Sequence, residues 1–149
     1  MTAYQIAKVS TSKNNGDACE HDLCAHMGLN RTHHDSTNYM AHSDIETEDF
    51  NISVKSARFT LMSGKVATDN NLTSFDEIVD FYFATTHSNM WAYVTKDRMV
   101  YMMNADEFRA FVYAFCGMER ESTKNGGGLK LKARMESKKM LRWLEEHRA

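Results

Sequence analysis

Asp44 and Lys55 are the residues of this sequence whose types and spacing could carry chemistry. They lie in the stretch SDIETEDFNISVKSARFTL, residues 43–61, where Asp44 opens one short strand-like run and Lys55 lies within the next. A carboxylate can bind a hard divalent cation, and a nearby ammonium group can position the water that attacks a phosphodiester. Such a spacing is common by chance, so the alternative interpretation makes Asp44 a turn cap and Lys55 a solvated strand lysine.

Alternating and helical patterns predict the elements that must position these two residues. Residues 50–59 alternate, which places Ser53 and Lys55 on the same face of a strand. The other predicted elements are a helix over 14–29 that ends at Gly28, a strand around 39–48, a loop or short hairpin over 61–72, a helix over 73–88, two strands within 90–104, a helix over 105–118 that ends at Gly117, a strand over 129–135 and a helix over 136–149. This order predicts one α/β domain over residues 1–149, with a mixed sheet of about five strands flanked by helices.

The order of helix, hairpin, helix and strand, with Asp44 opening one hairpin strand and SVKS in the other, resembles the PD-(D/E)xK nuclease superfamily of restriction endonucleases, Holliday-junction resolvases and phage nucleases. The resemblance covers about residues 17–96 and leaves 97–149 as a helix-strand-helix extension. It implies a restriction-endonuclease-like αβββαβ core, DNA as the substrate and Mg²⁺ or Mn²⁺ as the cofactor. Residues 42–64 are also similar to small phage or prophage proteins.

On this resemblance, Asp44 binds the metal and Lys55 orients the attacking water. The family's acid two residues before the lysine is replaced here by Ser53, whose hydroxyl could still hold a metal-bound water. Some members of the family place the missing acid on the first helix. Glu20 is the candidate there, because it shares a helical stripe with Leu23 and should face the sheet. Glu46 is a second candidate metal ligand, because it shares a strand face with Asp44.

The replacement of the acid also leaves a second hypothesis open. A nuclease fold that has lost its acid would act by binding DNA or a partner protein, and a phage-encoded inhibitor of a host defence nuclease would fit that description. A plain interaction domain with no nuclease ancestry is the third possibility. The nuclease requires two carboxylates around one hard ion, whereas the binding protein requires only a basic face or an apolar patch.

Basic residues collect near the end of the chain and predict a phosphate-binding surface. Residues 124–142 hold seven Lys and Arg residues against Glu136 alone, whereas residues 1–50 hold eight acids against three basic residues. The candidate DNA-binding residues are Lys130, Lys132 and Arg134 on one strand face, followed by Lys138, Lys139 and Arg142 on the last helix. The alternative is a solvated edge strand that its lysines protect from aggregation.

Length and composition restrict the classes of protein that fit. The chain has 149 residues, 42% hydrophobic and 26% charged, as in a globular domain with its own core. No apolar run approaches the ~20 residues of a membrane span, the N-terminus lacks an apolar secretory segment, and the three cysteines are an odd number. These features predict a cytoplasmic protein without a membrane anchor. A homodimer is possible by analogy with nucleases that cut both DNA strands.

Overall fold

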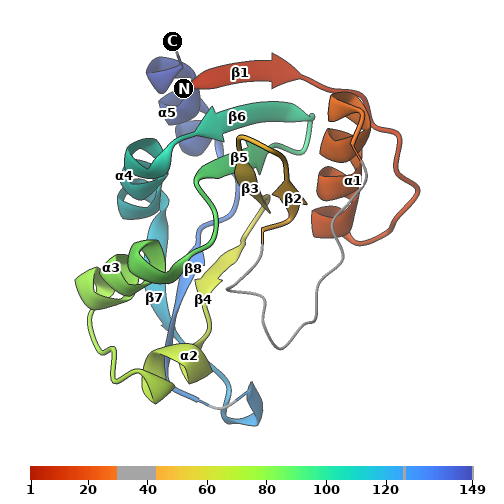
Figure 1. The fold of residues 1–149 in the computed structure, drawn as a ribbon. Helices are drawn as coiled ribbons and strands as arrows, with labels where there is room; N and C mark the ends of the chain where they lie inside the picture. Colours follow the sequence, from red (N-terminus) through yellow and green to blue (C-terminus); the bar gives the residue numbers. More distant parts are fainter. Residues whose placement is uncertain (30–42, 126, 149) are drawn as a thin grey trace.

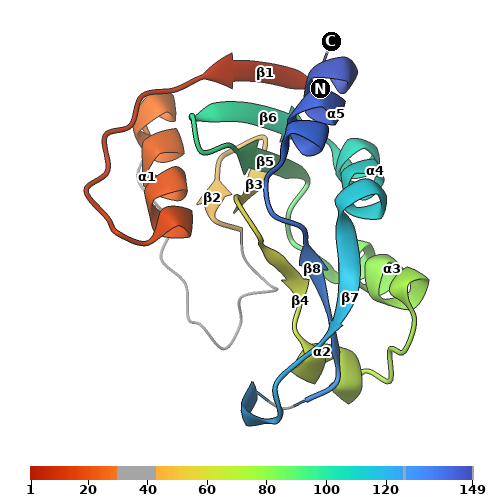
Figure 2. The same ribbon diagram turned by 180° about the vertical axis from the view of Figure 1, so that it is seen from behind.

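The computed structural model describes residues 1–29, 43–125 and 127–148. Its strands are β1 (Thr2–Gln5), β2 (Ile45–Glu46), β3 (Asn51–Lys55), β4 (Thr60–Met62), β5 (Met90–Val94), β6 (Met99–Met103), β7 (Cys116–Arg120) and β8 (Leu129–Ala133). Its helices are α1 (Asn15–Met27), α2 (Gly64–Asp69), α3 (Phe75–Thr85), α4 (Ala105–Phe115) and α5 (Lys138–His147), with a 3-10 turn at Thr123–Asn125. Figure 1 shows how these elements are arranged, and Figure 2 shows them from behind.

Within the described residues, five strands form a mixed sheet in the order β1-β6-β5-β3-β2, which we call the main sheet. β3 and β5 are parallel, because the chain leaves the sheet after β3 and passes through β4, α2 and α3 before it returns. The other neighbouring strands are antiparallel. The predicted α/β class with a mixed sheet of five strands is thereby confirmed.

A smaller sheet in the order β4-β8-β7 lies beside the main sheet and was not predicted (Figure 2). β7 begins at Cys116, directly after α4 ends, so the prediction that this helix continues to Gly117 is wrong. The strand forms because Cys116 and Met118 pair with Ala133 and Leu131 of β8.

Three shorter elements also differ from the sequence prediction. Residues 61–72, expected to be a loop or hairpin, contain the end of β4 and the helix α2, which Ser63 caps by accepting a hydrogen bond from the Val66 N–H. The N-terminal strand β1 was not predicted. The strand expected around 39–48 is observed only as β2, and its first part, 39–42, falls outside the described residues.

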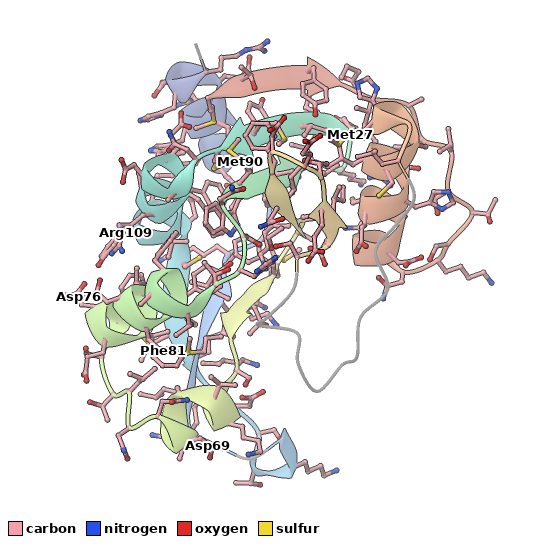
Figure 3. All side chains as sticks on the ribbon, in the orientation of Figure 1. Met27, Asp69, Asp76, Phe81, Met90 and Arg109 are labelled. Carbon is pink, nitrogen blue, oxygen red and sulfur yellow. The ribbon has the colours of Figure 1, made fainter. Side chains whose placement is uncertain are left out.

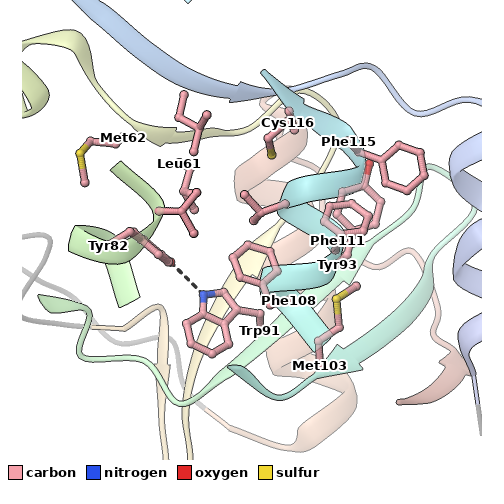
Figure 4. Close-up of a cluster of buried hydrophobic side chains, with 14 of the residues drawn as sticks. Leu61, Met62, Tyr82, Trp91, Tyr93, Met103, Phe108, Phe111, Phe115 and Cys116 are labelled. Carbon is pink, nitrogen blue, oxygen red and sulfur yellow. Dashed lines mark hydrogen bonds between the residues drawn. The ribbon is translucent and has the colours of Figure 1, made fainter. Parts of the chain in front are cut away.

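The main sheet buries a different cluster on each face. One face packs against α1, and this cluster includes Cys19, Leu23, Ile52, Ala92 and Val94. The other face packs against α3, α4, α5 and the smaller sheet, and this cluster is rich in aromatic side chains (Figure 4). In its centre the Trp91 ring stacks on the Phe108 ring, with 5.1 Å between centroids, and Trp91 Nε1 donates to the Tyr82 hydroxyl at 2.8 Å. Packing of this kind makes the main sheet a rigid platform.

A buried ion pair fixes α1 to the turn between β5 and β6. Asp22 of α1 is 1% exposed, and its Oδ2 accepts a hydrogen bond from Arg98 Nε at 2.7 Å. Its Oδ1 accepts from the backbone N–H groups of Val9 and Ser10 at 2.8 and 2.7 Å. Arg98 has a positive φ of 65°, a backbone conformation that residues other than glycine adopt only when their surroundings hold it. The pair therefore ties the middle of α1 to this turn.

Close backbone contact joins α2 to the turn between β7 and β8. A Cβ atom at Gly64 would collide with the Gly127 carbonyl oxygen, and the Gly64 N–H donates to the Glu121 carboxylate. Gly128, in the turn just before β8, has a φ of 83° and also lies close to the Gly64 backbone. Only glycine fits at these positions, and the contact fixes the far end of the smaller sheet.

The outer side of α3 and α4 is polar. Arg109 Nη1 of α4 lies 2.9 Å from Asp80 Oδ1 of α3, and its guanidinium lies 4.6 Å from the centre of the Phe83 ring. Figure 3 shows Arg109 and Asp76 on this outer side of the two helices. Among the described residues, no helix combines the length and the apolar character that crossing a membrane requires.

Candidate functional site

Asp44 lies directly before β2, and its carboxylate reaches across the hairpin to β3. Asp44 Oδ2 accepts a hydrogen bond from the Val54 N–H at 2.7 Å. Because β2 and β3 are antiparallel, the start of β2 lies beside the end of β3, where Lys55 is found. The structure therefore brings Asp44 to the Lys55 end of β3, and one of its carboxylate oxygens holds the hairpin together.

Ser53 and Lys55 lie on the face of the main sheet that carries the aromatic core. Their register partners are Trp91 and Tyr93, and the Ser53 side chain is 8% exposed. A carboxylate in place of Ser53 would be buried beside an aromatic ring and would lose its hydration. This burial gives a physical reason for a small hydroxyl side chain at the position where the resembling family carries an acid.

The charge of Lys55 lies at the edge of this core. Its Nζ is 5.6 Å from the centre of the Phe59 ring, a cation–π distance. Burial raises the pKa of the nearby Cys116 thiol to about 12, although the Lys55 charge acts in the opposite direction. Cys116 is therefore an uncharged core side chain at neutral pH, whereas Lys55 brings a positive charge to this edge of the core.

Glu20 approaches from the opposite side of the main sheet. It lies on α1, whose buried residues Leu23 and Cys24 pack on the face opposite Lys55. Glu20 itself is half-buried, at the margin of that contact. Glu20 and Lys55 therefore lie on opposite sides of the main sheet.

The Glu46 carboxylate, the other candidate metal ligand, makes contacts within the hairpin and with a neighbouring loop. Glu46 Oε1 accepts a hydrogen bond from the Ser43 N–H at 3.2 Å and lies 3.4 Å from His87 Nε2. In the parts of the chain that the structure describes, no group of three or more His, Cys, Asp or Glu side chains is arranged to hold a metal ion. An Mg²⁺ or Mn²⁺ ion held by Asp44 with Glu20 or Glu46 would therefore take its remaining oxygen ligands from water and phosphate.

A hollow of about 400 Å³ opens beside Lys55, and we call it the Lys55 hollow. Its described lining consists of Asn14, Asn15, Gly16, Val54, Lys55, Ser56, Ala57, Arg58 and Phe59. Lys55 and Arg58 are the two cations of this lining, and none of these residues is acidic. The start of α1 forms the opposite wall, where Asn15 Nδ2 donates to Ser56 Oγ at 3.4 Å. The chemistry of the lining suits an anion such as a phosphate group.

The predicted basic strand lies next to this hollow, in the centre of the smaller sheet. β8 is hydrogen-bonded to β4 on one side and to β7 on the other, so the alternative of an edge strand is wrong. The predicted alternation is confirmed, because Leu131 and Ala133 are buried whereas Lys132 is half-buried and Arg134 is exposed.

Arg58 joins the same surface. Its Nη2 lies 2.5 Å from Glu119 Oε1, and Glu119 is the register partner of Lys130. We therefore define the basic face as Arg58, Lys130, Lys132 and Arg134. It adjoins the Lys55 hollow through Arg58, which belongs to both. Lys138, Lys139 and Arg142 are exposed on α5, which lies beside β1 at the other end of β8 from Lys130 (Figure 1).

Sequence reasoning missed Arg58, although the signal was present. The stretch SVKSAR places Arg58 three residues after Lys55, just beyond the predicted strand. Its role depends on β4 leaving the main sheet and pairing with β8, which no local pattern indicates. Comparison with protein-family models, curated proteins and solved structures finds no match for this chain.

Proposed function

We propose that this chain binds the phosphate backbone of DNA and does not hydrolyse it. The observation that carries the proposal is that Lys55 and Arg58 line one hollow whose described lining contains no acid, while Arg58 also pairs with Glu119 outside that lining. The basic face continues from Arg58, so a chain of phosphates can run from the hollow across β8. The acids that hydrolysis would require make structural contacts instead: Asp44 accepts a hydrogen bond from the Val54 N–H, and Glu46 lies beside His87.

The chemistry of this surface favours backbone binding over sequence reading. Lysine and arginine attract phosphates irrespective of the base sequence, and each neutralised phosphate releases counterions. Base reading requires side chains that enter a groove in a fixed orientation. The basic face offers charges for phosphates, so the proposal is for binding with little sequence preference.

The affinity for DNA should depend steeply on salt. With about four phosphate contacts, the dissociation constant should rise roughly 100- to 200-fold between 50 and 200 mM salt. Lys55→Ala and Arg58→Ala should each weaken binding about 5- to 20-fold and lower the salt slope by about one. Fluorescence anisotropy with labelled DNA measures both quantities.

Lys8→Ala is the matched control for these variants, because Lys8 is exposed and lines neither the hollow nor the basic face. It removes the same charge and should change affinity less than about 2-fold. Equal losses in all three variants would show that only net charge matters, and the proposed site would then be abandoned.

DNA cleavage is the second candidate function, and one specific observation favours it. Asp44 lies at the Lys55 end of β3, and the hairpin β2–β3 is followed by α3 and the parallel strand β5. This arrangement supports a restriction-endonuclease-like core, although β4 pairs in the smaller sheet. Under this second proposal, Asp44 and Glu20 would hold the metal, and Lys55 would stabilise charge on the phosphate.

Our first proposal predicts no cleavage of linear, supercoiled or single-stranded DNA in Mg²⁺ or Mn²⁺ above the level without protein, while binding persists. Gel electrophoresis after prolonged incubation measures this. Cleavage that Asp44→Asn, Glu20→Gln and Lys55→Ala each abolish would replace the first proposal by the second. Cleavage that survives these changes would contradict both.

A further inference from the structure

A second hollow, of about 500 Å³, adjoins the Lys55 hollow, and we call it the Met135 hollow. Its described lining consists of Asn15, Ala57, Arg58, Lys96, Met135 and Glu136. Asn15, Ala57 and Arg58 line both hollows, so the two are neighbouring parts of one groove. The groove is formed by the start of α1, the β3–β4 connection, the β5–β6 turn and the β8–α5 connection.

The two parts of the groove differ in charge. The described lining of the Lys55 hollow has two cations and no acid, whereas that of the Met135 hollow includes Glu136 together with Arg58 and Lys96. Glu136 Oε1 is held in place by the Lys96 backbone N–H at 3.1 Å. A fixed carboxylate repels a phosphate but accepts hydrogen bonds from N–H groups. The phosphate therefore belongs in the Lys55 hollow, and the Met135 hollow suits a group with N–H donors.

Met135 adds an apolar surface to this second part. Its side chain is 70% exposed, which is unusual for a large apolar residue and is the highest value among the exposed large hydrophobic residues of the described chain. A methionine side chain is flexible and polarisable, so it packs well against a flat ring. A hollow of about 500 Å³ lies in the size range of sites for small organic groups.

We propose that the groove binds single-stranded DNA, with a phosphate in the Lys55 hollow and the adjoining base in the Met135 hollow. This inference rests on the proposed function and names the form of DNA that the site takes. A nucleotide carries its base and phosphate on one sugar, which matches two neighbouring hollows that share Arg58 as a wall. In a duplex the bases are stacked and paired inside the helix, so a base reaches such a hollow only from a single strand or after flipping out.

Binding of three ligands of about 10 nucleotides distinguishes the contribution of the Lys55 hollow from that of the Met135 hollow. They are a single strand of DNA, the duplex of the same sequence, and an abasic single strand that keeps the phosphates and lacks the bases. The wild-type protein should bind the single strand at least about 10-fold more tightly than either of the others. Fluorescence anisotropy at one fixed salt concentration gives all three dissociation constants.

Met135→Ala should weaken binding of the single strand about 5- to 10-fold and leave binding of the abasic strand unchanged. Phe50→Ala is the matched control, because Phe50 is also an exposed apolar residue (48%). Phe50 lies just before the first residue of β3, whereas Lys55 is the last residue of that strand. That control should leave every affinity unchanged. Arg58→Ala should weaken binding of the single strand and of the abasic strand alike, because the Arg58 charge attracts phosphates, which both strands keep.

Equal affinities for single strand and duplex, with no effect of Met135→Ala, would overturn this inference. The proposed function would survive that outcome if Lys55→Ala and Arg58→Ala still weaken binding. No salt-dependent binding of any of the three ligands would instead remove the proposed function itself. Tighter binding of a single strand of RNA than of the DNA strand would overturn the assignment to DNA.

Discussion

Replacing Asp22 by alanine should lower the free energy of unfolding by about 3–5 kcal/mol. The change leaves the Arg98 guanidinium buried without its carboxylate partner, since Arg98 is only 7% exposed. It also leaves the N–H groups of Val9 and Ser10 without their acceptor. Unpaired buried charge and unsatisfied donors are among the few mechanisms that produce losses of this size. Urea denaturation followed by circular dichroism measures the change.

Asp69→Ala is the matched control for this change. Asp69 also pairs with a cation, because its Oδ2 lies 2.7 Å from Lys65 Nζ, but both side chains are well exposed. Exposed pairs contribute about 0–1 kcal/mol, so this variant should unfold almost as the wild type does. A loss below about 1 kcal/mol in Asp22→Ala would show that the α1 anchor does not carry the stability assigned to it.

The same anchor should make stability depend on acid. Burial alone would raise the pKa of Asp22, but hydrogen bonds from Arg98, Val9 and Ser10 more than offset this and hold the pKa below its usual value. In the unfolded chain the carboxyl titrates at about 3.9, so its contribution is fully present above that pH and is lost as the pH falls through the folded-state pKa. The wild type should therefore lose more stability on acidification below about pH 4 than Asp22→Asn loses.

Local periodicity predicted the elements whose side chains are buried at regular spacing. Ile78, Val79 and Tyr82 lie inward on α3, and Leu131 and Ala133 lie inward on β8, as the patterns indicated. β1 and β7 were not predicted, because each forms a strand by pairing with a partner strand and not by a pattern in its own sequence. β1 pairs with β6 nearly a hundred residues later in the chain, and its own alternation is weak.

The candidate site likewise has one part that could be predicted from local sequence and one part that could not. Lys55 and the approach of Asp44 to β3 follow from a hairpin, which is local in sequence. The groove instead joins Asn15, Arg58, Lys96 and Met135, which come from four separate segments. The smaller sheet, the Asp22–Arg98 pair and the contacts of Asn15 with Ser56 and of Glu136 with Lys96 bring these segments together, so no spacing in the sequence could have indicated the groove.

Reversing two charges on the basic face should have the largest effect on binding. Lys132→Glu combined with Arg134→Glu removes two phosphate contacts and adds two repulsive carboxylates beside Arg58. Affinity for DNA at physiological salt should fall at least about 100-fold, and the salt slope should decrease by about two. Neither side chain is buried, so the variant should keep the wild-type circular dichroism spectrum.

A second double reversal separates this local effect from the change in net charge. Lys8→Glu combined with Lys65→Glu changes the net charge by the same amount at two exposed lysines that line neither hollow. At physiological salt, charges farther than about 8 Å from a ligand are largely screened, so this variant should lose less than about 5-fold in affinity. If both double variants lose affinity equally, binding follows the overall charge of the protein and β8 is not the surface that contacts DNA. If only the first variant loses affinity, the phosphates lie along β8, and the Lys55 hollow is where that path begins.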